Sequence, residues 1–138
     1  MLDLRYLERL ELGTPYPDIA ERVAEITRSP ALGGRCHLAV DATGVGRPVV
    51  DLLRRARPSA RILPAVIGSG DRETVDRGYY RVPKRDIIVG LQVLVQSGGL
   101  RIAAGLRHGP ALVKEMADMQ VRVTATGYEQ YGAWREGT

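Results

Sequence analysis

The sequence predicts one α/β domain, residues 1–138, that contains at least one parallel βαβ unit. Short apolar segments alternate along the chain with segments whose apolar residues recur at helical spacing. Glycine and proline punctuate the connections between them. The length of 138 residues suits a single hydrophobic core. Strands that alternate with helices are typical of a parallel sheet.

The first two elements are a strand and a helix. Leu4–Leu12 alternates imperfectly and ends at a Gly-Thr-Pro turn, which favours a strand. Tyr16–Arg28 predicts a helix, because its apolar residues recur at helical spacing and Pro17 lies in the first turn. These apolar residues are Ile19, Val23 and Ile26.

A second strand, helix and strand follow. Cys36–Val40 is a short apolar run between glycine and an acid, as expected of a buried parallel strand. Pro48 lies in the first turn of the next helix, whose apolar side is Val49, Val50, Leu52 and Leu53. Arg61–Ile67 predicts another strand, and Pro64 indicates an edge position or a bulge.

The last third of the chain is predicted to hold a loop, two helices and a hairpin. The polar residues Gly68–Tyr80 favour a loop. A helix with Ile87, Ile88, Leu91, Leu94 and Val95 on one face follows and ends near Ser97. Leu100–Ala103 is a short strand or link, Gly109–Gln120 is helical, and Val121–Trp134 alternates around a turn, as in a hairpin.

Composition narrows the class of protein. With 44% hydrophobic and 26% charged residues, the chain is globular rather than disordered. It has no apolar run of membrane-spanning length and no signal peptide, so we expect no membrane partner and a cytoplasmic location. The single cysteine, Cys36, fits a reducing compartment. A net charge of +4, carried mostly by arginine, indicates nucleic-acid binding only weakly.

One acid stands where an α/β sheet places its ligands. Asp41 ends the predicted strand, and Gly44 and Gly46 precede the helix that contains Pro48. The carboxyl ends of parallel strands and the N-termini of helices share one edge of such a sheet.

Three interpretations of Asp41 remain open. A phosphate loop would need a lysine followed by serine or threonine, and this pair is absent. A dinucleotide-binding fingerprint would need a third glycine, which is also absent. A carboxylate at a strand end can instead hold magnesium against a nucleic-acid phosphate. Asp41 can also cap its own turn through an Asx-type hydrogen bond.

Several ordered blocks together resemble a known family. The blocks "VDATGVGRPVVDLLRRA", "RVPKRDIIVGLQVLVQSGGLRIA" and "YGAWREGT" resemble the C-terminal nuclease domain of phage terminase large subunits. The similarity runs from about Arg5 to Thr138. It implies an incomplete ribonuclease-H-like mixed sheet flanked by helices, with a C-terminal β-hairpin. It also implies a two-metal endodeoxyribonuclease that cuts viral DNA during genome packaging in a bacterial host cell.

The resemblance assigns roles to particular residues. It implies that Asp41 is a catalytic acid that binds Mg²⁺ or Mn²⁺, and that Gly44 and Gly46 form the turn after it. Lys84 and Arg85 match a basic block ahead of a long helix, near the DNA backbone. A separate basic run that could face double-stranded DNA consists of Arg47, Arg54, Arg55, Arg57 and Arg61.

The chain departs from the family at both ends. The family's first two strands, with the first acid, and its final His-Asp-Asp block have no counterpart, so one of about three expected acids is present. We therefore expect weak or no cleavage by this chain, or, alternatively, a non-catalytic nucleic-acid-binding or assembly module. The strand that ends at Asp41 would have an open edge. Either the Leu4–Leu12 strand pairs with this edge, or another chain covers it, in a homo-oligomer or with other terminase parts.

Overall fold

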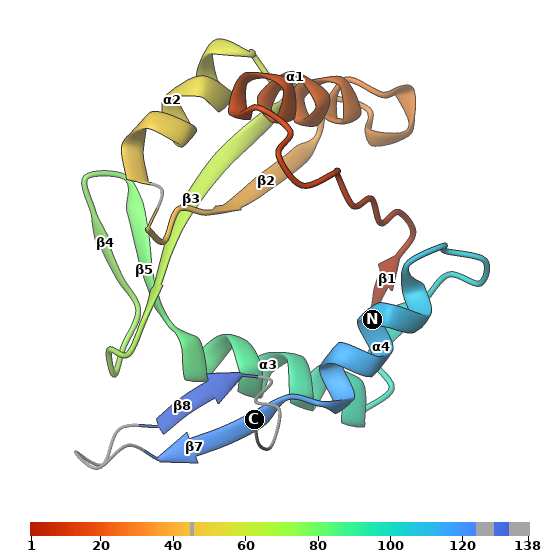
Figure 1. Cartoon of the computed structure of the whole chain (residues 1–138), viewed down its shortest axis with the longest axis vertical. Coiled ribbons are helices and arrows are strands. Elements are labelled where there is room, and N and C mark those ends of the chain that lie inside the picture. Colours follow the sequence, from red (N-terminus) through yellow and green to blue (C-terminus); the bar gives the residue numbers. More distant parts are fainter. Residues whose placement is uncertain (45, 124–128, 133–138) are drawn as a thin grey trace. The chain divides into compact units, whose positions relative to one another are not determined.

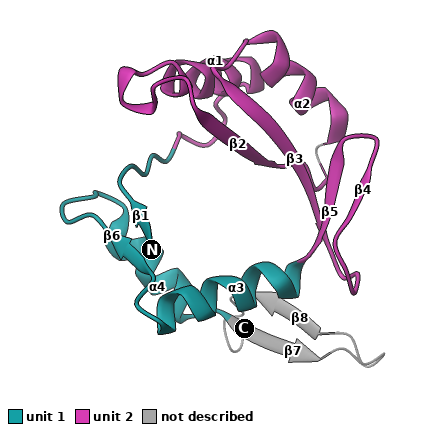
Figure 2. Ribbon diagram, turned by 180° about the vertical axis from the view of Figure 1, so that it is seen from behind, with its two compact units in different colours: residues 1–9, 84–138 teal, residues 10–83 magenta. Residues whose placement is uncertain are grey.

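The computed structural model describes residues 1–44, 46–123 and 129–132, and the chain divides into two compact units. Unit 1 comprises residues 1–9 and 84–138, and unit 2 comprises Leu10–Pro83 (Figure 2). Helices occur together with a mixed sheet, so the predicted α/β class is confirmed. That residues 1–138 form one domain stays a prediction.

Unit 2 is built on a four-stranded sheet in the order β2-β3-β5-β4. Its strands are β2 (Cys36–Asp41), β3 (Ala60–Gly68), β4 (Thr74–Asp76) and β5 (Tyr79–Pro83). β2, β3 and β5 run parallel, and β4 is antiparallel to β5. The predicted parallel βαβ unit is therefore present, with β2 and β3 as its strands.

Two helices lie on one side of β2 and β3 (Figure 1). They are α1 (Tyr16–Thr27) and α2 (Gly46–Arg55), both close to their predicted positions. Their buried apolar residues are Ala20, Ala24, Val50 and Leu53. Burial alternates along β2, with Leu38 and Val40 half-buried and His37 and Ala39 exposed. This strand therefore packs on one face only.

Pro64 fits an interior strand because the pairing of β3 is staggered. β3 lies between β2 and β5, so the strand as a whole is not at an edge. Its pairing with β5 begins only at Ala65, whereas its pairing with β2 extends over Ala60–Ala65. At Pro64 the strand thus has one neighbour, and the missing N–H of proline interrupts no second ladder.

The loop predicted for residues 68–80 is wrong over its second half. Asp76 pairs with Tyr79 across a two-residue turn, so β4 and β5 form a hairpin. Arg77 and Gly78 both have positive φ, 51° and 82°, as a type I′ turn requires. The segment is mostly polar, so its sequence gives few signs of a hairpin. The only signs are the glycine at the turn, Gly78, and the valine and tyrosines that flank it.

The strand predicted for Leu4–Leu12 is also wrong. The observed strand, β1, covers only Leu2–Leu4 and pairs in parallel with β6 (Leu100–Ile102) in unit 1. Beyond Leu4 the charged residues occupy both alternating sets of positions, so neither face of a strand would be apolar. These residues are Arg5, Glu8, Arg9 and Glu11.

The other elements of unit 1 follow the predicted order. Helices α3 (Lys84–Gln96) and α4 (Gly109–Ala117) precede the antiparallel strands β7 (Gln120–Val123) and β8 (Glu129–Gly132). The two strands of the predicted hairpin are thus confirmed, and the turn between them lies outside the described residues. No residue of α3 is buried, and Ile88, Leu91 and Leu94 of its predicted apolar face are half-buried.

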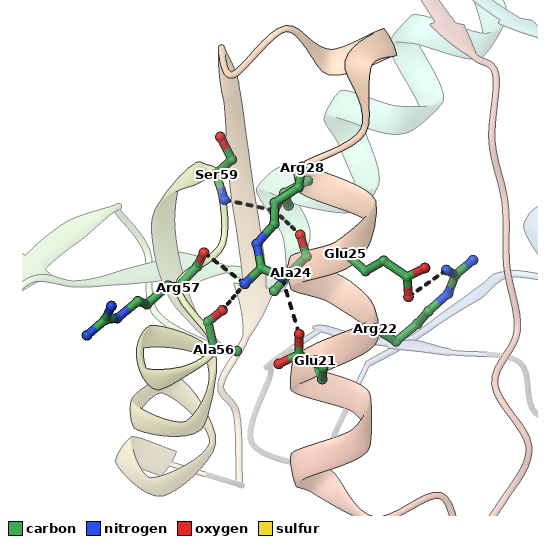
Figure 3. Close-up of polar contacts among 9 residues, drawn as sticks. Glu21, Arg22, Ala24, Glu25, Arg28, Ala56, Arg57 and Ser59 are labelled. Carbon is green, nitrogen blue, oxygen red and sulfur yellow. Dashed lines mark hydrogen bonds and ion pairs between the residues drawn. The ribbon is translucent and has the colours of Figure 1, made fainter.

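Polar contacts fasten the C-terminal end of α1 to the segment that joins α2 to β3. The Thr27 hydroxyl donates to the Ala24 carbonyl at 2.7 Å and accepts from the Ser59 N–H at 2.9 Å. The Arg28 guanidinium donates to the carbonyls of Ala56 and Arg57 (Figure 3). The contacts to Ala56, Arg57 and Ser59 join this end of α1 to the chain about thirty residues away.

Thr27→Val should destabilise unit 2, because it removes the buried hydroxyl that accepts a hydrogen bond from Ser59. The Ser59 N–H would then be left without this acceptor. We expect a loss of about 1–2 kcal/mol in the free energy of unfolding, measured by urea denaturation with circular dichroism. Thr27→Ser keeps the hydroxyl and is the matched control, with a smaller expected loss. Equal stability of Thr27→Val and the wild type would contradict this role.

Candidate nucleic-acid interface

Asp41 lies at the carboxyl end of the parallel pair β2–β3. It is in register with Ala65, and the N–H of the next residue, Ala42, donates to the Ala65 carbonyl at 2.8 Å. Helix α2 begins at Gly46, so four residues separate the last residue of the strand from the first residue of the helix. The Asp41 side chain is exposed at this edge of the sheet, as the sequence predicted.

The turn after Asp41 is held by Thr43. The Asp41 Oδ1 accepts from the Thr43 N–H at 2.9 Å, which is the Asx-type turn considered as one interpretation. The Thr43 hydroxyl accepts from the Ile67 N–H of β3 at 2.8 Å. Gly44 and Gly46 have φ of 77° and 65°, in the left-handed region that glycine tolerates. These contacts fix the carboxylate relative to β3.

Thr43 also affects the ionisation of Asp41. Hydrogen bonding from the Thr43 hydroxyl, and then from its backbone N–H, lowers the pKa of Asp41, against a smaller opposing effect of desolvation. The carboxylate is therefore anionic at neutral pH. An exposed anion at a strand end can attract a cation or accept hydrogen bonds from a ligand.

The described residues do not assemble a set of metal ligands around Asp41. In this part of the chain no three His, Cys, Asp or Glu side chains converge on a possible metal position. Asp76 is on β4, three strands away from β2 and thus at about 14 Å for a strand spacing of about 4.8 Å. Two catalytic ions lie only about 3.5–4 Å apart. Asp41 by itself does not fit a two-metal site.

The predicted DNA-binding residues fall in different units. Arg47 lies in the first turn of α2, in unit 2 with Asp41, and its side chain is exposed. Lys84 and Arg85 begin α3 in unit 1, where Arg85 forms an ion pair with Asp86 at 3.7 Å. The structure thus brings Arg47, but neither basic residue of α3, to the unit that carries Asp41.

Residues that the sequence prediction missed lie beside Arg47. Arg77, Tyr79 and Arg81 of the β4–β5 hairpin share a pocket with Arg47. Arg77 and Tyr79 lie in residues 68–80, which were predicted to form a loop, and Arg81 follows this segment directly. Recognition of the two-residue turn would have indicated the hairpin, but the position of the hairpin beside the start of α2 depends on the β3–β5 pairing.

No protein-family model, curated protein or solved structure matches this chain. Among the described helices, none combines the length and the apolar character needed to cross a membrane.

Thr43→Val should raise the pKa of Asp41, because the variant removes the hydroxyl that contributes most to lowering it. In the wild type, a folded pKa below the unfolded value of about 3.9 means that ionised Asp41 stabilises the fold above that value. This stabilisation is lost as the pH falls through the folded pKa.

Carboxyl ¹³C NMR titration measures this pKa, and Asp41→Asn identifies the signal. Thr43→Ser keeps the hydroxyl and should leave the titration near that of the wild type. An unchanged titration in Thr43→Val would show that its hydroxyl does not control Asp41.

Proposed function

We propose that this chain is a DNA-binding scaffold of the ribonuclease-H-like terminase nuclease type, which supplies one metal-binding acid, Asp41. The ordered sequence blocks support this proposal, as does a carboxylate at the end of a parallel strand beside a helix start. The observation that carries it is the exposed, anionic Asp41 in the same unit as Arg47. Its target would be double-stranded DNA in the cytoplasm of a bacterial host.

Cleavage by this chain alone should be weak or absent. Two-metal hydrolysis of a phosphodiester needs carboxylates from several elements, and Asp41 is without a described second acid near enough to share ions. A single carboxylate would bind Mg²⁺ or Mn²⁺ weakly, because magnesium gives up its water ligands reluctantly. Additional acids would have to come from another polypeptide segment.

A second candidate is a non-catalytic nucleic-acid-binding or assembly module. The absence of a ligand set among the described residues favours it, as do exposed arginines without an ion-pair partner in that part of the chain. This function would need the basic surface of unit 2 but would not need Asp41.

Nicking of supercoiled plasmid with Mn²⁺ distinguishes the two candidates. We expect slow nicking by the wild type, abolished in Asp41→Asn, with DNA binding retained in both. Asp51→Asn is the matched control, since Asp51 is also an exposed acid of unit 2 but pairs with Arg54 on α2. Nicking that survives Asp41→Asn contradicts a catalytic Asp41, and salt-sensitive binding without any nicking favours the second candidate.

We also infer that a second copy of the chain covers the edge of β2. Among the described residues, β3 is the only strand paired with β2. Cys36–Asp41 contains no proline or lysine, the residues that commonly protect an edge strand. Antiparallel pairing of two copies about Leu38 would keep each side chain on its present face and set Arg35 opposite the partner's Asp41.

Ala39→Lys tests this pairing, because Ala39 is exposed on β2 and lysine disfavours edge-to-edge association. Light scattering should give a dimer for the wild type and a monomer for Ala39→Lys. Ala31→Lys places the same charge on an exposed position of the short 3₁₀ helix Pro30–Leu32 and should remain dimeric. A wild type that is monomeric at high concentration would exclude this interface.

A further inference from the structure

A small polar pocket lies beside the start of α2, entirely within unit 2. It has a volume of about 200 Å³ and is bounded by the first residues of α2, by Val66 of β3 and by the β4–β5 hairpin. Its polar side chains come from elements that are separated in the sequence. These side chains are Arg47, Asp76, Arg77, Tyr79 and Arg81.

The lining of this pocket is strongly cationic. Three arginines face one acid, which leaves a net charge of plus two. Asp76 lies 3.9 Å from Arg81, a long ion pair with exposed partners. Within the described part of the chain, neither Arg47 nor Arg77 forms an ion pair. Two guanidinium groups are thus available for planar, bidentate contact with an oxyanion.

The start of α2 contributes to this pocket mainly through the Arg47 side chain. The Gly46 N–H already donates to the Ala42 carbonyl at 3.1 Å, and Pro48 has no N–H. The Tyr79 hydroxyl has no hydrogen-bond partner among the described residues, but it is closed off from solvent and therefore presents no donor to the pocket.

We propose that this pocket binds a phosphate group of a nucleic-acid backbone. The Arg47 and Arg77 guanidinium groups contact the phosphate oxygens through charge-assisted, bidentate hydrogen bonds. The oxyanion chemistry follows from the pocket itself, whereas the nucleic-acid source of the phosphate rests on the proposed function.

The chain offers a matched pair of variants for the test. Arg77 and Arg57 are the two described non-glycine residues with positive φ, 51° and 52°, and both are exposed residues of unit 2. Only Arg77 lines the pocket. Because glycine tolerates this backbone conformation, Arg77→Gly and Arg57→Gly each remove one cation without adding backbone strain.

The first measurement uses inorganic phosphate and requires no nucleic acid. Phosphate should raise the melting temperature of the wild type and of Arg57→Gly relative to chloride at equal ionic strength. The rise should be lost in Arg77→Gly.

The second measurement follows the binding of a 20-base-pair DNA duplex as a function of salt. Loss of one phosphate contact should weaken binding by Arg77→Gly about tenfold and reduce its salt slope by about one. The DNA control is Arg107→Gln, an exposed arginine of unit 1 outside both the pocket and the predicted basic run, which should stay close to the wild type. Equal slopes for Arg77→Gly and Arg107→Gln, together with equal phosphate effects in Arg77→Gly and Arg57→Gly, would overturn the proposal. An Arg77-dependent phosphate effect without DNA binding would overturn the nucleic-acid source and retain a site for free phosphate.

These results are independent of the nicking assay. Failure to nick plasmid would count against a catalytic Asp41 and leave the pocket unaffected, because Asp41 does not line it. Conversely, the absence of phosphate binding at the pocket would not affect the conclusion drawn from nicking that depends on Asp41.

Discussion

The parallel pairing of β2 with β3 is the constraint on which the rest of unit 2 depends. A parallel pair needs a crossover, and α2 provides it by returning the chain from the end of β2 to the start of β3. This connection places Asp41 and the start of α2 at the same edge of the sheet. Pairing of β5 with β3 then brings the β4–β5 hairpin beside the same edge. The positions of Asp41, of the start of α2 and of the β4–β5 hairpin therefore follow from the parallel direction of β2, β3 and β5.

The packing of this sheet is one-sided. α1 and α2 lie on one side of β2 and β3, and the contacts of Thr27 and Arg28 hold α1 in that layer (Figure 3). The other side of β2 exposes His37 and Ala39. Parallel strands are usually covered on both faces and paired on both edges. A bare face and a free edge on one strand explain why association with further protein is a reasonable expectation for β2.

Two groups of opposite charge occupy the carboxyl edge of unit 2. Hydrogen bonds from Thr43 lower the pKa of the anionic Asp41, while the hairpin adds Arg77 and Arg81 to the cationic Arg47. In a phosphodiester reaction, arginines can hold the phosphate, whereas a carboxylate can attract a metal cation. The two groups therefore serve different parts of the reaction. The proposed phosphate pocket therefore does not depend on a complete set of metal-binding acids, which the described residues do not assemble.

The sequence by itself determined the local elements with strong periodicity or clear boundaries. The helix after Tyr16, the strand that ends at Asp41 and the glycine turn before α2 all follow from apolar spacing and backbone chemistry. It failed for Leu4–Leu12, where an approximate alternation had no apolar face to bury. Local sequence patterns of this kind predict which secondary structure a segment can form. They do not predict which other segments it packs against.

Only the tertiary structure decided which groups meet. Arg47 and Arg77 are thirty residues apart, and their approach depends on the β3–β5 pairing and on a two-residue turn within a polar segment. The partner of the Thr43 hydroxyl, Ile67, likewise belongs to another strand. Strand order and register fix such contacts, and both arise from the packing of the whole unit. The sequence therefore identified the acid at the strand end, and the fold supplied the basic pocket beside it.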